Sequence, residues 1–235
     1  MHPLIRTART TGLLYLGLAV TGLLGFLVVR ARLFDADDPG ATLANLVAHP
    51  SLARAGVALG LLIVTTQALV AVWFHRLFRT ADPLAAAGIA AFGLVNAVVI
   101  LIDTAVLATA AQLARDPVGD AATAVQLLYL VGGNLWGVGA LFFGLWLIPM
   151  GRCVLRSGWM PRPLGWILVG GGVGYLLSAF TAYLAPDAPA VDEVLVLPAT
   201  VGELWMVGYL LVRGVRRRAL GETAPSPGPP APIAA

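Results

Sequence analysis

A single carboxyl group stands in the middle of the apolar stretch VLVLPATVGELWMVGYLLVRG, residues 194–214. In a helix, Glu203 would lie about 13 Å from either end of Val194–Val212, and the nearest basic residue in the chain is Arg213. A charged side chain at the centre of a bilayer costs at least about 2.5–3.5 kcal/mol and usually faces the protein interior or a water-filled cavity. We therefore expect Glu203 to point inward, and to be protonated or enclosed by hydrogen-bonding groups.

Other apolar stretches carry polar groups that could act with Glu203. Asn96 and Asp103 are seven residues apart, so in a helix they share one face. Pro198 precedes Glu203 by five residues and should kink the helix at that point. The candidate intramembrane polar site comprises Glu203, Asp103, Asn96, Asn134, Gln67 and Ser178.

These residues allow two interpretations. In the first, Glu203, Asn96, Asp103 and Asn134 form a structural hydrogen-bond network that fixes the register of the helices. In the second, they line the path of a small-solute or proton-coupled transporter, with Glu203 as the proton-binding group. No arginine falls within the predicted spans, so the carboxyls need a proton, a cation or a cage of amides and hydroxyls. We favour the structural interpretation, which leaves the molecular function unknown.

The chain lacks the residue patterns of several familiar catalysts. His2, His49 and His75 fall at the ends of apolar runs or between them, and Cys153 is the only cysteine, so neither haem nor zinc has an evident ligand set. HExxH and GxSxG motifs are absent, and Ser178 is the only serine within an apolar run. We therefore expect no catalytic residue, no metal and no cofactor, and an enzyme is the less favoured class.

The amino-acid composition predicts the kind of secondary structure that positions these residues. Of the 235 residues, 59% are hydrophobic and 11% are charged, whereas soluble domains carry about 25% charged residues. Apolar runs long enough to cross a bilayer, without the alternation of barrel strands, predict helices. The sequence predicts an all-α integral membrane protein, a six-transmembrane-helix bundle with spans Thr11–Val29, Val57–Phe78, Leu84–Ala111, Ala121–Met150, Leu164–Tyr183 and Val194–Val212.

Two segments lie outside these spans. The first long connection contains DDPGATLANLVAHP, which predicts a short interfacial helix with a proline near its start, or more simply a lid over the bundle. The end of the chain, TAPSPGPPAPIAA, is rich in proline and alanine and cannot form a core. We expect a transmembrane domain over residues 1–215 and a disordered cytoplasmic tail over residues 216–235.

The distribution of arginine predicts the orientation. All 15 basic residues are arginine, and 11 of them fall at the two termini and in the second and fourth connections. The positive-inside rule then places both termini in the cytoplasm. Because the arginines flank apolar runs, we expect the lipid bilayer as partner and no nucleic acid.

Three GxxxG spacings, Gly56–Gly60, Gly133–Gly137 and Gly170–Gly174, allow close helix contacts. We expect them to serve packing within one chain. A homo-oligomer through these faces is the alternative, and a small molecule or a proton is the ligand that the transporter interpretation implies.

Four stretches carry a resemblance to a known family: RTTGLLYL (9–16), ARAGVALGLL (53–62), LFFGLWLIPMGRCVLRSGWMPRPLGWILVGGGVGYLLSAF (141–180) and LPATVGELWMVGYLLVRGV (197–215). Over residues 6–215 the chain resembles the bacterial membrane-protein family catalogued as domain of unknown function 4386. The chain departs from the family at Trp159, where tyrosine is more usual, and at Asp103, where asparagine or another small polar residue is expected. The resemblance implies a multi-pass protein of the bacterial plasma (inner) membrane, makes Glu203 a family feature, and implies no reaction.

Overall fold

The structure is a computed structural model that describes residues 2–187 and 189–216. In these ranges all regular secondary structure is helical, without a strand. The helical segments are α1 (Pro3–Leu24), the π-helix η1 (Gly25–Arg30), α2 (Ala31–Leu33), α3 (Pro39–Ala48), α4 (Pro50–Phe78), α5 (Pro83–Arg115), α6 (Ala121–Ser157), α7 (Arg162–Leu184) and α8 (Pro189–Val212). The predicted disordered tail covers residues 216–235, and all of these except residue 216 lie outside the described part of the chain.

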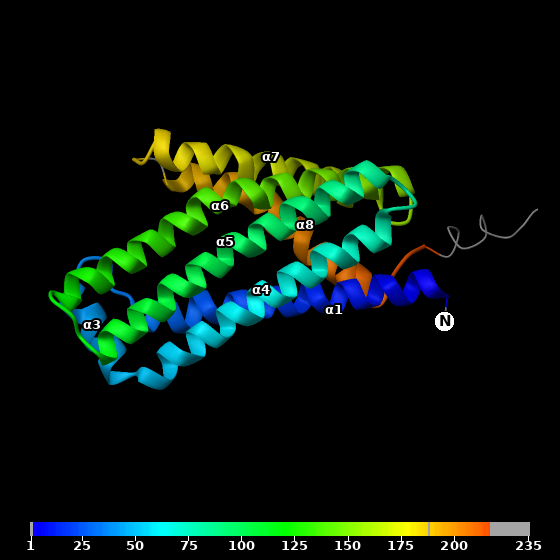
Figure 1. Ribbon diagram of the computed structural model, residues 1–235. Coiled ribbons are helices and arrows are strands. Elements are labelled where there is room, and N and C mark those ends of the chain that lie inside the picture. The colour runs from blue at the N-terminus through cyan, green and yellow to red at the C-terminus, as the bar shows by residue number, and fades with distance from the viewer. Residues whose placement is uncertain (1, 188, 217–235) are drawn as a thin grey trace, which may run out of the picture.

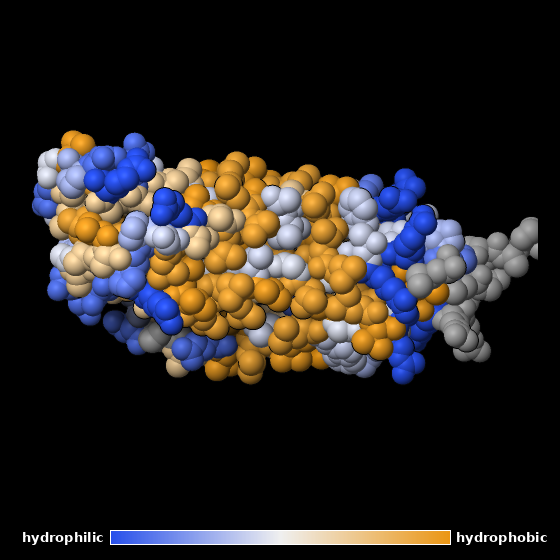
Figure 2. Space-filling view, turned by 90° about the horizontal axis from the view of Figure 1, so that it is seen from below, coloured by the Kyte–Doolittle hydropathy of each residue, from blue (hydrophilic) through white to orange (hydrophobic). Residues whose placement is uncertain are grey.

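The prediction of six spans is confirmed, because six of these helices are long and apolar enough to cross a membrane. They are longer than the apolar runs suggested: the first candidate span covers Pro3–Leu33 and the fourth covers Ala121–Ser157. Figure 2 shows the consequence on the surface, an apolar band between two more polar ends.

Local sequence explains where several helices begin. Asp38, Asp82 and Asp120 are N-cap residues whose carboxylates accept backbone N–H bonds from the first turn, at 2.9 to 3.2 Å. Proline follows directly after Asp38 and Asp82, at a position where its missing N–H costs nothing. Hydrogen bonds from Thr123 lower the pKa of Asp120.

The contacts between the six long helices form a closed ring in chain order. Each of α4, α5, α6 and α7 packs against its neighbours in sequence, and α8 packs against both α7 and α1. The first part of α8 runs beside α7, and its last part crosses to the start of α1 (Figure 1). Residues 2 and 216 therefore lie at the same end of the bundle, which we call the terminal end, and α3 lies at the opposite end, which we call the α3 end.

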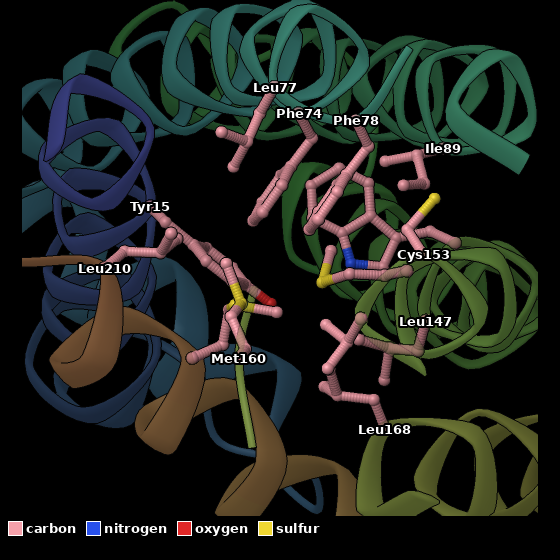
Figure 3. Packing of buried hydrophobic residues seen from close by; sticks show 14 of the residues in the cluster. Tyr15, Phe74, Leu77, Phe78, Ile89, Leu147, Cys153, Met160, Leu168 and Leu210 are labelled. Carbon is pink, nitrogen blue, oxygen red and sulfur yellow. The ribbon is translucent and has the colours of Figure 1, made fainter. Parts of the chain in front are cut away.

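The terminal half of the ring is filled by a dense apolar core (Figure 3). Tyr15, Phe74 and Trp146, from three different helices, meet edge to face with ring centroids 5.5 to 5.9 Å apart. Leu168 from α7 and Leu210 from α8 are fully buried beside them. All sides of the ring therefore contribute to one core.

The connection between α6 and α7 closes the terminal end. α6 ends at Gly158, whose φ of +65° suits glycine. Met160 is fully buried in the core, and Trp159 stacks on Phe78 with ring centroids 5.9 Å apart. The connection is therefore ordered, and its central residues face the core.

An ion-pair cluster fastens the same end. Arg152 Nε and Arg156 Nη1 lie 2.8 and 3.1 Å from Oδ2 of Asp82, whose side chain is almost fully buried. The hydrogen bond from Arg152 holds the pKa of Asp82 below its ordinary value. Two of the arginines that predict orientation thus also join α6 to the connection between α4 and α5.

The α3 end has a second apolar core, formed by Leu33, Leu46, Val125, Tyr129 and their neighbours. α3 packs chiefly on α6 and also touches α5 and α4. Gln126 Nε2 donates to the carbonyl oxygens of Asp35 and Ala36 at 3.0 and 2.9 Å, which fastens the connection before α3. The helix predicted in the first long connection is therefore present, and it covers this end of the bundle.

Candidate functional site

The carboxyl of Glu203 has a partner on another helix. The hydroxyl of Tyr15, in α1, donates a hydrogen bond to Oε1 of Glu203, in α8. Tyr15 is 3% exposed, whereas Glu203 is half-buried. The bond joins the two helices that close the ring. Oε2 of Glu203 has no hydrogen-bond partner among the described residues.

Glu203 lines a pocket of about 330 Å³ between α1 and α8, which we call the lateral pocket. Its rim carries exposed apolar side chains, among them Leu23 on α1 and Leu204 on α8, which are 57% and 61% exposed. The pocket therefore opens sideways from the bundle. Its lining is Tyr15, Leu18, Ala19, Gly22, Leu23, Phe26, Ile63, Ile100, Trp136, Phe143, Thr200, Glu203, Leu204 and Val207.

The second intramembrane carboxyl lies in a neighbouring cavity. Asp103, on α5, is 5% exposed, and its Oδ2 accepts a hydrogen bond from Trp136 Nε1 at 2.8 Å. Its Oδ1 has no hydrogen-bond partner in the described part of the chain. The cavity beside it has a volume of about 60 Å³, which is room for a few water molecules. We call it the inner cavity.

An arginine also reaches the inner cavity, which sequence reasoning missed. The segment Gly25–Arg30 is a π-helix, and it extends the first span beyond its predicted end at Val29. Arg30 lines the same cavity as Asp103, and its guanidinium lies 4.7 Å from the ring centroid of Phe34. Arg30 therefore lies within the first candidate span, Pro3–Leu33, past the end at Val29 that the sequence predicts. Arg30 and Asp103 do not form an ion pair within 4 Å.

The lateral pocket and the inner cavity share part of their walls. Phe26, Ile63, Ile100 and Trp136 line both of them. Phe26 and Trp136 meet edge to face with ring centroids 4.6 Å apart. The two carboxyls are thus separated by a short apolar partition, and Trp136 contacts the lateral pocket while its indole N–H binds Asp103.

The remaining predicted site residues fall in different places. Asn96 is 1% exposed and faces a crevice that it shares with Asp103, but its amide has no hydrogen-bond partner among the described residues. Gln67 donates to the carbonyl of Gly93 at 3.3 Å, and Ser178 donates to the carbonyl of Tyr175 at 3.0 Å. Neither residue lines the lateral pocket.

Asn134 is exposed and lies apart from the pockets. Its amide oxygen accepts a bond from Tyr183 at 3.3 Å, which joins α6 to α7. The structure thus brings Asn96 and Asp103 to one wall and Glu203 to the adjoining pocket. No hydrogen bond joins Glu203 to any of the other five candidates in residues 2–187 and 189–216.

Tyr15, Trp136 and Arg30 are the residues that sequence reasoning missed. Tyr15 and Trp136 are amphipathic aromatic residues in otherwise apolar runs, and such residues usually find a hydrogen-bond partner when buried, which is the signal that could have found them. In the described part of the chain, no cluster of three His, Cys, Asp or Glu side chains could hold a metal ion.

Comparison with known proteins identifies one family. A family model described as Domain of unknown function (DUF4386) matches residues 10–214. No curated protein and no solved structure matches the chain.

Proposed function

The chain belongs to the DUF4386 family, a domain of unknown function, and we propose that it binds a small molecule in the lateral pocket. The ligand is mainly apolar and carries one hydrogen-bonding group, such as a hydroxyl or an amide. It enters from the bilayer between α1 and α8. The protein is a multi-pass protein of the bacterial plasma membrane.

The position of Glu203 carries this proposal. Its carboxyl is the acidic group in the wall of a pocket whose other walls are mostly apolar, and among the described residues only its Oε1 has a hydrogen-bond partner. Small-molecule sites combine apolar walls with a few polar groups that orient the ligand. Oε2 of Glu203 and the hydroxyl of Thr200 are the groups that would orient a ligand here.

A proton-coupled transporter is the second candidate, and the asymmetry of the bundle favours it. The terminal half has a dense core closed by Met160, while the lateral pocket and the inner cavity lie farther toward the α3 end. Such an arrangement suits one state of an alternating-access cycle, in which Glu203 exchanges a proton when its bond to Tyr15 breaks. If the protein is not a transporter, the hydrogen bond between Tyr15 and Glu203 serves only to hold α1 and α8 together.

Filling the lateral pocket tests the binding proposal. Gly22 lines the pocket, and a Cβ there would meet nothing within 4 Å, so Gly22→Phe should occupy the space without disturbing the fold. The probe is a long-chain alcohol bearing a photoreactive diazirine, added to protein in lipid nanodiscs. Mass spectrometry should map its crosslinks to α1 and α8 beside Glu203, and Gly22→Phe should reduce them several-fold.

Gly170→Phe is the matched control, because a Cβ at Gly170 also meets nothing within 4 Å but Gly170 does not line the lateral pocket. This variant should keep the wild-type labelling. Crosslinks spread evenly over the apolar surface, or unchanged labelling of Gly22→Phe, would contradict a binding pocket.

We further propose that both termini are cytoplasmic and that α3 lies at the outer membrane surface. The support is the excess of arginine in the sequence of the two termini and of the second and fourth connections, 11 of 15 residues. A reporter that is active only in the cytoplasm should therefore work when fused after Arg218. Activity of an exported reporter at the same position, with a silent cytoplasmic one, would show the opposite orientation.

A further inference from the structure

We infer that a groove at the terminal end binds the headgroup of an anionic phospholipid. The groove lies between the start of α1 and the end of α8, and we call it the arginine groove. It is lined by Ile5, Arg9, Tyr209, Val212, Arg213, Val215 and Arg216. Its ligand is the phosphate of a lipid such as phosphatidylglycerol, and it is distinct from the lateral pocket.

The described residues that line this groove include three arginines, Arg9, Arg213 and Arg216, and no acidic residue. Arg9 comes from α1, whereas Arg213 and Arg216 follow the last turn of α8. No carboxylate lies within 4 Å of Arg213 or Arg216 in the described part of the chain. By contrast, Arg152 and Arg156 at the same end are both paired with Asp82. Arg213 and Arg216 therefore bring positive charge to the groove that no carboxylate among residues 2–187 and 189–216 pairs with.

The segment that carries Arg213 and Arg216 is fixed before any lipid binds. Gly214 adopts a φ of +69°, which turns the chain directly after α8 and suits glycine. Val215 is 3% exposed in the core, and the backbone N–H of Arg216 donates to the carbonyl of Trp159 at 3.0 Å. Little backbone entropy is then lost on binding, which favours affinity.

The shape of the groove favours a lipid over a free anion. Ile5, Val212 and Val215 give it apolar walls below the arginines, and Val212 is 72% exposed. The apolar band of the surface gives way to polar residues toward the terminal end of the bundle (Figure 2). A phospholipid can place its phosphate among the guanidinium groups and its acyl chains along α8.

The test compares lipid retention by native mass spectrometry and thermal unfolding in nanodiscs of phosphatidylcholine with or without phosphatidylglycerol. Wild type should retain phosphatidylglycerol selectively and unfold at a higher temperature in its presence. Arg213→Gln combined with Arg216→Gln should weaken this binding by roughly 30-fold, about fivefold for each charge removed. The double lysine variant, Arg213→Lys with Arg216→Lys, should retain most of it.

The control removes two other charges from the same end. Arg79 and Arg162 are exposed and lie outside the groove, so Arg79→Gln with Arg162→Gln should bind like wild type. If the control and the groove variant lost phosphatidylglycerol binding equally, the binding would depend on general surface charge. That result would overturn the site. Competition by millimolar inorganic phosphate would also overturn it, since the groove would then hold a free anion. In pure phosphatidylcholine, each glutamine variant should unfold at the same temperature as wild type. If the glutamine variant of the groove is less stable there, the lysine variant is used to test the site instead. Loss of selective phosphatidylglycerol binding in the lysine variant would then overturn the site.

Discussion

Gly174→Ala should destabilise the protein by about 1–3 kcal/mol, the usual cost of forcing an extra group into a well-packed contact. Gly174 lies on the face of α7 that packs against α8, and a Cβ there would overlap the carbonyl oxygen of Leu195. Backbone of α8 cannot move aside as a flexible side chain would. The measurement is the midpoint of thermal unfolding in detergent.

Gly170→Ala is the matched control in the same helix. A Cβ at Gly170 meets nothing within 4 Å, and alanine favours a helix over glycine by roughly 0.5–1 kcal/mol. The two variants should therefore shift the unfolding temperature in opposite directions. A Gly174→Ala variant as stable as wild type would contradict the close contact between α7 and α8 at this position.

These glycines show what a GxxxG spacing can and cannot predict. Gly174 packs within the chain and Gly170 does not, although both belong to one motif. Gly171, between them, meets the backbone of Ala199 in α8. The spacing predicts that glycines lie on a helix face, but which of them meets a partner depends on how far the neighbouring helix is rotated. Association of copies through such faces stays a prediction.

The six spans could be read from the sequence because each depends only on local composition. The length of the first span could not, since the helical run continues past the predicted end at Val29, through the last residue of the π-helix and through α2, to Leu33. That one difference places Arg30 on the wall of the inner cavity with Asp103. A difference of a few residues between the predicted and the observed end of this span thus adds a positive charge to the predicted surroundings of Asp103.

The inward position of Glu203 followed from the energy of a carboxyl in lipid, but its partner did not. Tyr15 and Glu203 are 188 residues apart in the chain, and their contact depends on α8 leaving α7 and crossing to α1. The composition of α8 predicts a kink near Pro198 but not the direction in which the helix then runs. Contacts between helices that are far apart in the sequence depend on how all six long helices pack together, and the pattern of apolar and polar residues does not predict that packing.

Removing the carboxyl of Glu203 should separate its structural role from a proton-binding one. Glu203→Leu leaves the hydroxyl of Tyr15 without its partner in the apolar core, at a cost of about 1–3 kcal/mol. Glu203→Gln keeps an oxygen that can accept this bond, so its stability should stay close to wild type. Tyr15→Phe combined with Glu203→Leu should be more stable than Glu203→Leu alone, because removing both partners leaves no buried group unsatisfied.

The unfolding temperature of wild type, both Glu203 variants and the double variant should be measured in detergent from pH 5 to 9. A carboxyl can gain or lose a proton in its pocket and an amide cannot. A pH dependence that Glu203→Gln abolishes, with stability otherwise retained, would support Glu203 as a proton-binding group. Identical profiles for wild type and Gln would remove that support and leave the tie between α1 and α8. A Glu203→Leu variant as stable as wild type would contradict the tie itself, because the bond from Tyr15 would then contribute nothing to closing the ring.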